Sequence, residues 1–424
     1  MKVGLAPAAD ISRFSLWRER TVYLLIFLFP LFGISLNHWF STIYSLIFII
    51  SLTCLWERRG VELCREERIF LCLVTAYFIT FILSAVANEW GELQTRYLGV
   101  EIRYLAVIPI YLMLRNYGSN GRWLLAGVVL AAAVVGAQAY HDVYVLNKPR
   151  AWGVYSPNLL GSYAAILAAW LLIELRFRLK KRWWLIPLCF SALLAVALSG
   201  SRGAYLGFLV MSIVIIAVTL SHWRRYAAFV LVIIGLCSAY WLFDEMKQRV
   251  DSAVTEASEY LVKTDAVDFN RTLDGTAVRF EMWWFSGMVF LEDPLFGIGR
   301  GNYTAVADEY IKQGKIHPDV GNHAHPHNAY AEVLVSRGII GLCIFLLMLF
   351  YPLYFFFSTR HKAQYTALLG VVYITGFMVF SLTDSSTFIK GNFSSVFLLF
   401  LVVIFSWHLR ELGEVTGKRG IDKL

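Results

Sequence analysis

Residues 321–357 read GNHAHPHNAYAEVLVSRGIIGLCIFLLMLFYPLYFFF, and this stretch decides the fold of the chain. Its second part, residues 339–357, is an apolar run without a charged side chain, long enough to cross a ~30 Å hydrocarbon core as a helix. Its first part places His323, His325 and His327 where a polar segment meets that run. Imidazole exchanges protons near neutral pH, so a cluster of this kind beside a membrane indicates chemistry at the interface.

Similar apolar runs recur along the whole sequence. The chain is 58% hydrophobic and 16% charged, with a mean hydropathy of +0.59, a composition typical of membrane proteins. Because a helix satisfies its backbone hydrogen bonds internally, each run is expected to span the bilayer as a helix. The sequence therefore predicts an all-α polytopic membrane protein with twelve spans, at roughly 21–36, 38–56, 69–87, 97–114, 123–140, 158–175, 183–199, 203–220, 226–243, 333–357, 364–383 and 391–408.

The distribution of Lys and Arg predicts how these spans are oriented. Alternate connections, together with the two termini, hold 23 basic residues, whereas the opposite short connections hold five. Short cytoplasmic connections are enriched in Lys and Arg. Both termini are therefore expected in the cytoplasm, and the polar segment 243–330 is expected on the outer side. The whole chain, 1–424, is expected to form one membrane domain, with 243–330 as its large loop between spans nine and ten.

The remaining composition narrows the function classes. The net charge of +8 reflects membrane topology and attraction to anionic lipid, and it gives no indication of nucleic-acid binding. None of the six cysteines lies in the outer loop, so a disulfide framework is not expected there. The sequence contains no P-loop and no GxGxxG motif, which argues against an ATP-driven pump.

The outer loop itself is expected to be helical. Apolar residues recur at helical spacing over 243–262. Residues 276–291 contain four aromatic residues within six positions, typical of a helix lying in the membrane interface. A short helix is expected over 303–312, after the Pro/Gly-rich turn DPLFGIGRGNY.

Three arginines on the outer side are candidates for binding an anion. Arg202 lies in a tight, Gly-flanked hairpin between two spans, Arg279 lies near the start of the aromatic segment, and Arg150 lies in NKPRAWGVYSPN. A guanidinium offers several N–H donors to a phosphate and stays charged when partly buried. The alternative for Arg202 is a side chain that reaches the headgroups from a span end, and the alternative for Arg279 is anchoring to lipid phosphate.

The three histidines permit more than one reading. His-x-His-x-His can indicate a metal site, but Pro326 interrupts the run and no cysteine is near. His327 and Asn328 directly precede a helix, so a polar N-terminal cap is the alternative. Gly338 and Gly341 lie further along that helix, where glycine permits close packing.

The order of these motifs resembles that of the bacterial O-antigen ligases, within a superfamily that includes the lipid-linked polysaccharide polymerases. The resemblance rests on His327-Asn328 with Gly338 and Gly341, and on SGSRGAY, VRFEMW, PLFGIGRGNY and RAWGVYSPNLLG, together with the topology over most of the chain. It implies a membrane glycosyltransferase of the GT-C type that uses a polyprenyl-linked donor and needs no metal or other cofactor. It also implies functional roles for His327, Arg202 and Arg279, with His323 and His325 as support or bystanders.

The resemblance implies a specific reaction. Polysaccharide would pass from undecaprenyl pyrophosphate to a sugar hydroxyl of lipid A–core, at the periplasmic face of the inner membrane. His327 would act as general base, because a neutral imidazole has a pKa near ~6.5. Arg202 and Arg279, with Arg150 as a third candidate, would bind the pyrophosphate. The alternatives are an O-antigen polymerase, a protein O-oligosaccharyltransferase and, from another class, a lipid-linked oligosaccharide transporter.

Overall fold

The computed structural model describes residues 13–55, 62–118, 120–242, 244–262, 272–273, 275–389 and 391–421. Within these residues the chain is helical and contains no β-strand. Its α-helices are α1 (Arg13–Leu31), α2 (Trp39–Leu55), α3 (Arg65–Ala87), α4 (Glu92–Leu114), α5 (Asn120–Tyr140), α6 (Pro157–Arg182), α7 (Ile186–Ser199), α8 (Arg202–Thr219), α9 (His222–Leu242), α10 (Asp244–Val262), α11 (Gly275–Glu292), α12 (Tyr303–Lys312), α13 (Ala329–Thr359), α14 (Gln364–Thr383), α15 (Ser386–Ile389) and α16 (Gly391–Ile421).

The all-α, multi-pass character expected from the sequence is confirmed. Among the described residues, eight helical segments are long and apolar enough to cross a membrane. One of them, Pro157–Ser199, is 43 residues long and contains both α6 and α7, which pack against each other. A further apolar helix, Trp39–Cys54, is shorter. A helix lies over each of the twelve expected segments, but the number of spans stays a prediction.

Some residues on which the expectations rest lie outside the described residues. These are Phe243, residues 263–271 and Asp274 of the expected outer loop, and Lys390 among the counted basic residues. The same is true of residues 1–12, 56–61 and 422–424, which carry other counted basic positions.

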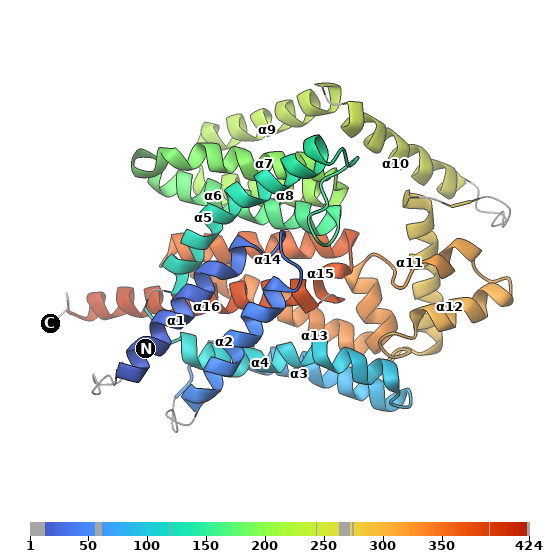
Figure 1. Ribbon diagram of the computed structural model, residues 1–424, viewed down its shortest axis with the longest axis horizontal. Coiled ribbons are helices and arrows are strands. Elements are labelled where there is room, and N and C mark those ends of the chain that lie inside the picture. Colours follow the sequence, from blue (N-terminus) through green and yellow to red (C-terminus); the bar gives the residue numbers. More distant parts are fainter. Residues whose placement is uncertain are drawn as a thin grey trace.

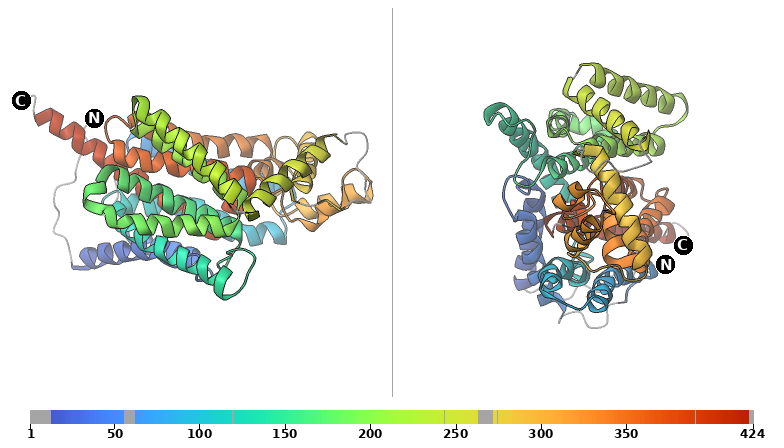
Figure 2. Two further views of the ribbon diagram at one scale, coloured as in Figure 1. Left: turned by 90° about the horizontal axis from the view of Figure 1, so that it is seen from above. Right: turned by 90° about the vertical axis from the view of Figure 1, so that its right-hand side faces the viewer.

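The long helices run side by side along the longest axis of the molecule (Figure 1). The described starts of α1 and ends of α16 lie at one end of this bundle, and α10, α11 and α12 lie at the other, in both Figure 1 and the left view of Figure 2. We call the second the loop end. The termini and the α10–α12 segment therefore lie at opposite ends of the bundle.

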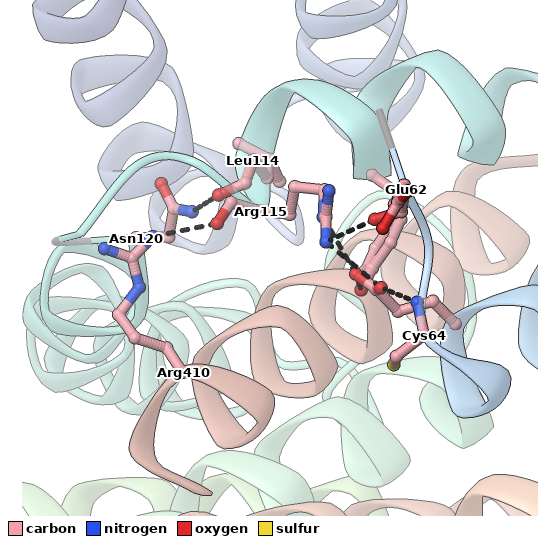
Figure 3. A network of polar contacts seen from close by, with 8 residues as sticks. Glu62, Cys64, Leu114, Arg115, Asn120 and Arg410 are labelled. Atoms are coloured by element: carbon pink, nitrogen blue, oxygen red, sulfur yellow. Dashed lines mark hydrogen bonds and ion pairs between the residues drawn. The ribbon is translucent and has the colours of Figure 1, made fainter. Parts of the chain in front are cut away.

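A polar network joins several helices at the end of the bundle away from the loop end (Figure 3). The Arg115 guanidinium, just after α4, donates through Nε to Glu67 Oε1 of α3 at 2.8 Å. The Arg410 guanidinium of α16 donates to the Arg115 carbonyl at 2.9 Å, and Asn120 Nδ2 donates to the Leu114 carbonyl at 2.7 Å. These contacts fasten α3, α4, α5 and α16 where the helices would otherwise leave buried polar groups unpaired.

The outer segment builds a small core of its own. Phe285 of α11, Tyr303 and Tyr310 of α12 and Val335 of α13 are buried together. The expected helices over 276–291 and 303–312 correspond to α11 and α12, and the one over 243–262 corresponds to α10. Trp283 packs against this core, and its Nε1 donates to the Pro326 carbonyl at 3.0 Å.

A backbone seam attaches this outer segment to α13. The Ile298 N–H donates to the Val335 carbonyl at 2.9 Å, and the Ile339 N–H donates to the Pro294 carbonyl at 2.8 Å. Between them Gly338 has φ +62 and ψ −164 and breaks the regular geometry of α13. A Cβ at this position would lie 2.3 Å from the carbonyl carbon of Leu295, so only glycine permits both the backbone conformation and the close approach.

Candidate active site at the loop end

His327 is the last residue before α13 and is held in an unusual conformation. Its φ is +50, in the left-handed region that few non-glycine residues adopt. The next residue, Asn328, caps the helix, with its Oδ1 accepting from the N–H groups of Tyr330 at 2.9 Å and Ala331 at 3.2 Å. Strained backbone of this kind concentrates at functional sites. The cap predicted for this position therefore belongs to Asn328, and it leaves the imidazole of His327 for other contacts.

Asp384 faces His327 from the end of α14. Its Oδ1 lies 3.9 Å from His327 Nδ1, an ion-pair distance longer than a hydrogen bond. Oδ1 also accepts from the Ser386 N–H at 2.8 Å, and Oδ2 accepts from Asn158 Nδ2 at 3.3 Å. Burial raises the pKa of Asp384, but His327 and the Ser386 N–H outweigh it and hold that pKa below its usual range. Asp384 is therefore a buried carboxylate beside the histidine.

The sequence analysis did not single out Asp384. A signal was available, because an ionisable residue directly follows the apolar run 364–383. An α-helical hairpin returns to the side of the membrane from which it started, and α13 and α14 pack as such a pair. The end of α14 must therefore lie beside the start of α13.

The other two histidines lie next to His327. The ring centroids of His325 and His327 are 4.5 Å apart, and those of His323 and His327 are 5.5 Å apart. Ser385 Oγ lies 2.8 Å from His325 Nδ1. Burial lowers the pKa of His323, and the nearby charges of His327 and Arg279 lower it further. Within the described part of the chain, no three His, Cys, Asp or Glu side chains are placed to hold a metal ion.

Arg202 contacts α11, the helix that carries Arg279. Arg202 is the first residue of α8, and its guanidinium donates to Thr276 Oγ1 at 3.0 Å and to Ser252 Oγ at 3.1 Å. Arg279 lies three residues after Thr276, on the same face of α11. Among the described residues, the Arg279 guanidinium makes no hydrogen bond or ion pair.

The charges around Arg279 connect the two arginines with the histidine. Burial lowers the pKa of Arg279, the carboxylate of Asp384 opposes this, and Arg202 adds to it. Arg279 therefore lies within electrostatic reach of both Arg202 and the Asp384–His327 pair. Since α8 packs along α14, the start of α8 lies near the residues that follow α14. Residues predicted from distant parts of the sequence thus gather at the loop end.

Arg150 is placed differently. Its Nε donates to the Ser199 carbonyl at 2.7 Å and its Nη2 to the Gly200 carbonyl at 3.1 Å, so the guanidinium caps the end of α7. A weaker contact at 3.5 Å joins Nη2 to Asn158 Oδ1, and Asn158 in turn contacts Asp384. Arg150 therefore borders the site through Asn158 and already satisfies its donors on backbone carbonyls.

Gly338 and Gly341 lie outside this cluster. Gly338 forms the seam with the outer segment, and a Cβ at Gly341 would lie 2.2 Å from the Cβ of Arg337. Arg337 belongs to a second, buried polar group, in which its Nη2 lies 2.6 Å from Glu101 Oε1. Arg300, from the outer segment, forms an ion pair with the same carboxylate. The two glycines therefore permit close packing around α13: Gly338 against the outer segment, and Gly341 against the Arg337 side chain.

The comparisons with known proteins point to one family. Residues 187–346 match the family model described as O-Antigen ligase. This region contains every site residue predicted from the sequence except Arg150, and it ends before Asp384.

Individual relatives have low sequence identity to this chain. A protein of Haemophilus influenzae named only as uncharacterized is 23% identical over 374 residues, which cover 85% of this chain and 90% of that protein. Proteins of Rickettsia conorii and Rickettsia bellii, each named "Putative polysaccharide ligase", are 25% and 27% identical over 43% of this chain and 42% of each relative. The resemblance drawn from the motifs is confirmed, because residues 187–346 match the O-Antigen ligase family model.

Proposed function

We propose that the protein is an O-antigen ligase that transfers polysaccharide from undecaprenyl pyrophosphate to a sugar hydroxyl of lipid A–core. One observation carries the proposal. His327, paired with Asp384, lies at the same end of the bundle as two arginines on adjoining helices, Arg202 and Arg279. A base beside an anion site is what glycosyl transfer from a pyrophosphate requires. A transporter would instead need ionisable groups along a path through the membrane.

In this mechanism His327 acts as general base. The acceptor hydroxyl loses its proton to the imidazole as its oxygen attacks the anomeric carbon of the donor sugar. The imidazole becomes positively charged, and the Asp384 carboxylate, 3.9 Å away, stabilises that charge. Asn158 and the Ser386 N–H hold Asp384 in place.

Arg202 and Arg279 bind the leaving group. As the glycosidic bond breaks, its electron pair stays with the pyrophosphate oxygen, and the growing negative charge is stabilised by the guanidinium groups. Loss of one such donor is expected to cost roughly 10²–10³ in rate. Attack from the face opposite the leaving group inverts the anomeric carbon. The reaction needs no nucleotide, because the glycosidic bond to the pyrophosphate already supplies the driving force, and in this mechanism the guanidinium groups stabilise the charge for which a metal ion could otherwise be required.

The proposed location is the periplasmic side of a Gram-negative inner membrane, with both termini in the cytoplasm and membrane lipid around the bundle. The charge bias of the connections supports this orientation. The arrangement of the molecule is consistent with it, since the described ends of the chain lie opposite the loop end that holds His327.

Replacement of His327 by Ala in the native host tests the proposal. Lipopolysaccharide resolved on a gel should show bare core, while fully polymerised lipid-linked O-antigen accumulates. Core capped by a single repeat unit would point to an O-antigen polymerase, and loss of protein glycosylation with normal lipopolysaccharide would point to a protein O-oligosaccharyltransferase. Normal laddering would refute an essential role for His327. His361→Ala is a matched control, because His361 is exposed in the turn between α13 and α14.

The absence of a metal requirement has a separate test. Transfer by the purified protein should be unchanged when a chelator is titrated into the assay. Activity that is lost with chelator and restored by a divalent cation would contradict the arginine-only account.

A further inference from the structure

A carboxylate of the chain itself occupies the start of α11. Glu256 of α10 accepts through Oε2 from the Thr276 N–H at 2.6 Å. A Cβ at Gly275 would lie 2.4 Å from the same oxygen, so the carboxylate rests directly on the first residues of the helix. The first N–H groups of a helix lack intrahelical partners and carry partial positive charge, and they therefore attract anions. Glu256 is the anion found at this position.

The same carboxylate lies beside the proposed leaving-group site. Thr276, which donates to Glu256 through its backbone, accepts from Arg202 through its hydroxyl. Ser252, four residues before Glu256 on the same face of α10, accepts a second hydrogen bond from Arg202 at 3.1 Å. Arg279 lies one turn after Thr276, and the charge of Glu256 raises the pKa of Arg279 against the effect of burial. One face of α10 thus contacts Arg202 and lies within electrostatic reach of Arg279.

We propose that Glu256 is an internal competitor for the donor, whose pyrophosphate displaces this carboxylate from the start of α11. The inference rests on the proposed function, because it assigns the displaced position to the pyrophosphate that Arg202 and Arg279 bind. The site is then occupied by the Glu256 carboxylate when no donor is bound and by the pyrophosphate when the donor binds. In the absence of donor the two arginines and the helix terminus face an anion, so the positive cluster is never left uncompensated.

The contacts of α10 allow the exchange without loss of the helix. Tyr260 Oη donates to Glu281 Oε2 at 2.7 Å and ties the end of α10 to α11. Tyr240 Oη of α9 donates to Asp251 Oδ1 at 2.7 Å near its start. Rotation of the Glu256 side chain away from Thr276 breaks neither contact. After transfer, the carboxylate returns to the Thr276 N–H and drives the lipid pyrophosphate product out.

Two kinetic effects distinguish a competitor from a structural residue. A charge-assisted hydrogen bond lost on donor binding weakens that binding by roughly 10- to 100-fold. Glu256→Gln keeps the shape of the side chain and removes the charge, so KM for the donor should fall by a factor in this range. Product should also bind more tightly, so kcat should fall as release slows. A variant that only damages packing would raise KM or lower kcat without tightening anion binding.

The direct test measures binding of inorganic pyrophosphate to the purified full-length protein in lipid nanodiscs by titration calorimetry. The Glu256→Gln variant should bind roughly 10- to 100-fold more tightly than the unchanged protein, and Glu256→Asp, which keeps the charge, should not. Glu309→Gln makes the same charge change at an exposed position of α12 and should leave the affinity unchanged.

The outcomes separate this inference from the proposed function. Equal or weaker binding by Glu256→Gln, with clear binding by the unchanged protein, would overturn the role of Glu256 alone. Binding that survives Arg279→Ala, or no binding by any variant, would overturn the pyrophosphate site and the inference with it.

Discussion

Replacement of Asp384 by Asn should slow glycosyl transfer while leaving the protein folded. Asn has the same shape, and its carbonyl oxygen can still accept from the Ser386 N–H that now donates to Asp384 at 2.8 Å. The substitution removes the negative charge 3.9 Å from His327 Nδ1, and it also replaces Oδ2, which accepts from Asn158 Nδ2 at 3.3 Å, with an amide nitrogen. If His327 becomes an imidazolium as it takes the acceptor proton, that state loses its nearest compensating charge.

The size of the effect follows from the distance and the surroundings. Two unit charges about 4 Å apart interact by roughly 4 kcal/mol near a protein surface and by about 1 kcal/mol in bulk water. Those limits correspond to rate losses of about 10³-fold and about 5-fold. The Asp384 side chain is 9% exposed and that of His327 is 27% exposed, so solvent screens the pair in part. A loss of kcat of about 10- to 100-fold, with KM for the donor nearly unchanged, is therefore expected.

The assay is transfer from purified lipid-linked polysaccharide to lipid A–core by the purified protein, with thermal unfolding of each variant as a check on the fold. Asp308→Asn is the matched control, because Asp308 is an exposed acid on α12. A kcat for Asp384→Asn equal to that of the control would refute the reasoning. So would an equal loss of activity in a His327→Ala background, because the carboxylate would then act independently of the imidazole.

Three further predictions concern stability. Because burial lowers the pKa of His323 in the folded protein, the unfolded chain binds its proton first as the pH falls. The contribution of His323 to stability is therefore complete above about pH 6.5 and declines below it, and His323→Asn should flatten the decline of Tm below about pH 6.5. Gly338→Ala should lower stability by roughly 1–3 kcal/mol, since the new Cβ meets backbone at 2.3 Å, whereas Gly99→Ala, with nothing within 4 Å, should leave Tm nearly unchanged. Glu101→Gln removes the carboxylate that forms ion pairs with the buried Arg300 and Arg337 and should cost roughly 3–5 kcal/mol, seen as a large fall in Tm. An unchanged pH profile of Tm in His323→Asn, or an unchanged Tm in Gly338→Ala or Glu101→Gln, would contradict the corresponding contact.

The helical fold could be predicted because hydrocarbon thickness fixes the length of an apolar helix. The same apolar pattern predicts twelve spans, and that number stays a prediction, because eight helical segments among the described residues are long and apolar enough to cross a membrane. Helix α1 contains the charged residues Arg18, Glu19 and Arg20 before its apolar part, so its apolar stretch is short. Helices α6 and α7 together form one long apolar segment, although the sequence predicts two spans there. The helix predicted around 303–312 corresponds to α12, because a Pro/Gly turn marks the region where it starts.

Candidate site residues could be proposed from the sequence where the residue type itself indicates a chemistry. A histidine at the start of a span and an arginine in a tight outer hairpin are unusual enough to be noticed singly. The contacts of Arg150 could not be predicted in this way. Its guanidinium donates to the carbonyls of Ser199 and Gly200, which lie about 49 residues later in the chain, and the sequence alone does not show that the end of α7 lies beside Arg150. The contact of Glu256 with α11 could not be predicted either, because a charged residue on an amphipathic helix is ordinarily expected to face solvent.

The position of Asp384 has a consequence for biosynthesis. His327, Arg202 and Arg279 are all synthesised before it, and the carboxylate that completes their arrangement follows directly after α14. A nascent chain that has inserted α1 to α13 therefore carries the arginines of the proposed donor site without the carboxylate beside the proposed base. We expect the protein to become competent for the proposed transfer only when α14 has been inserted.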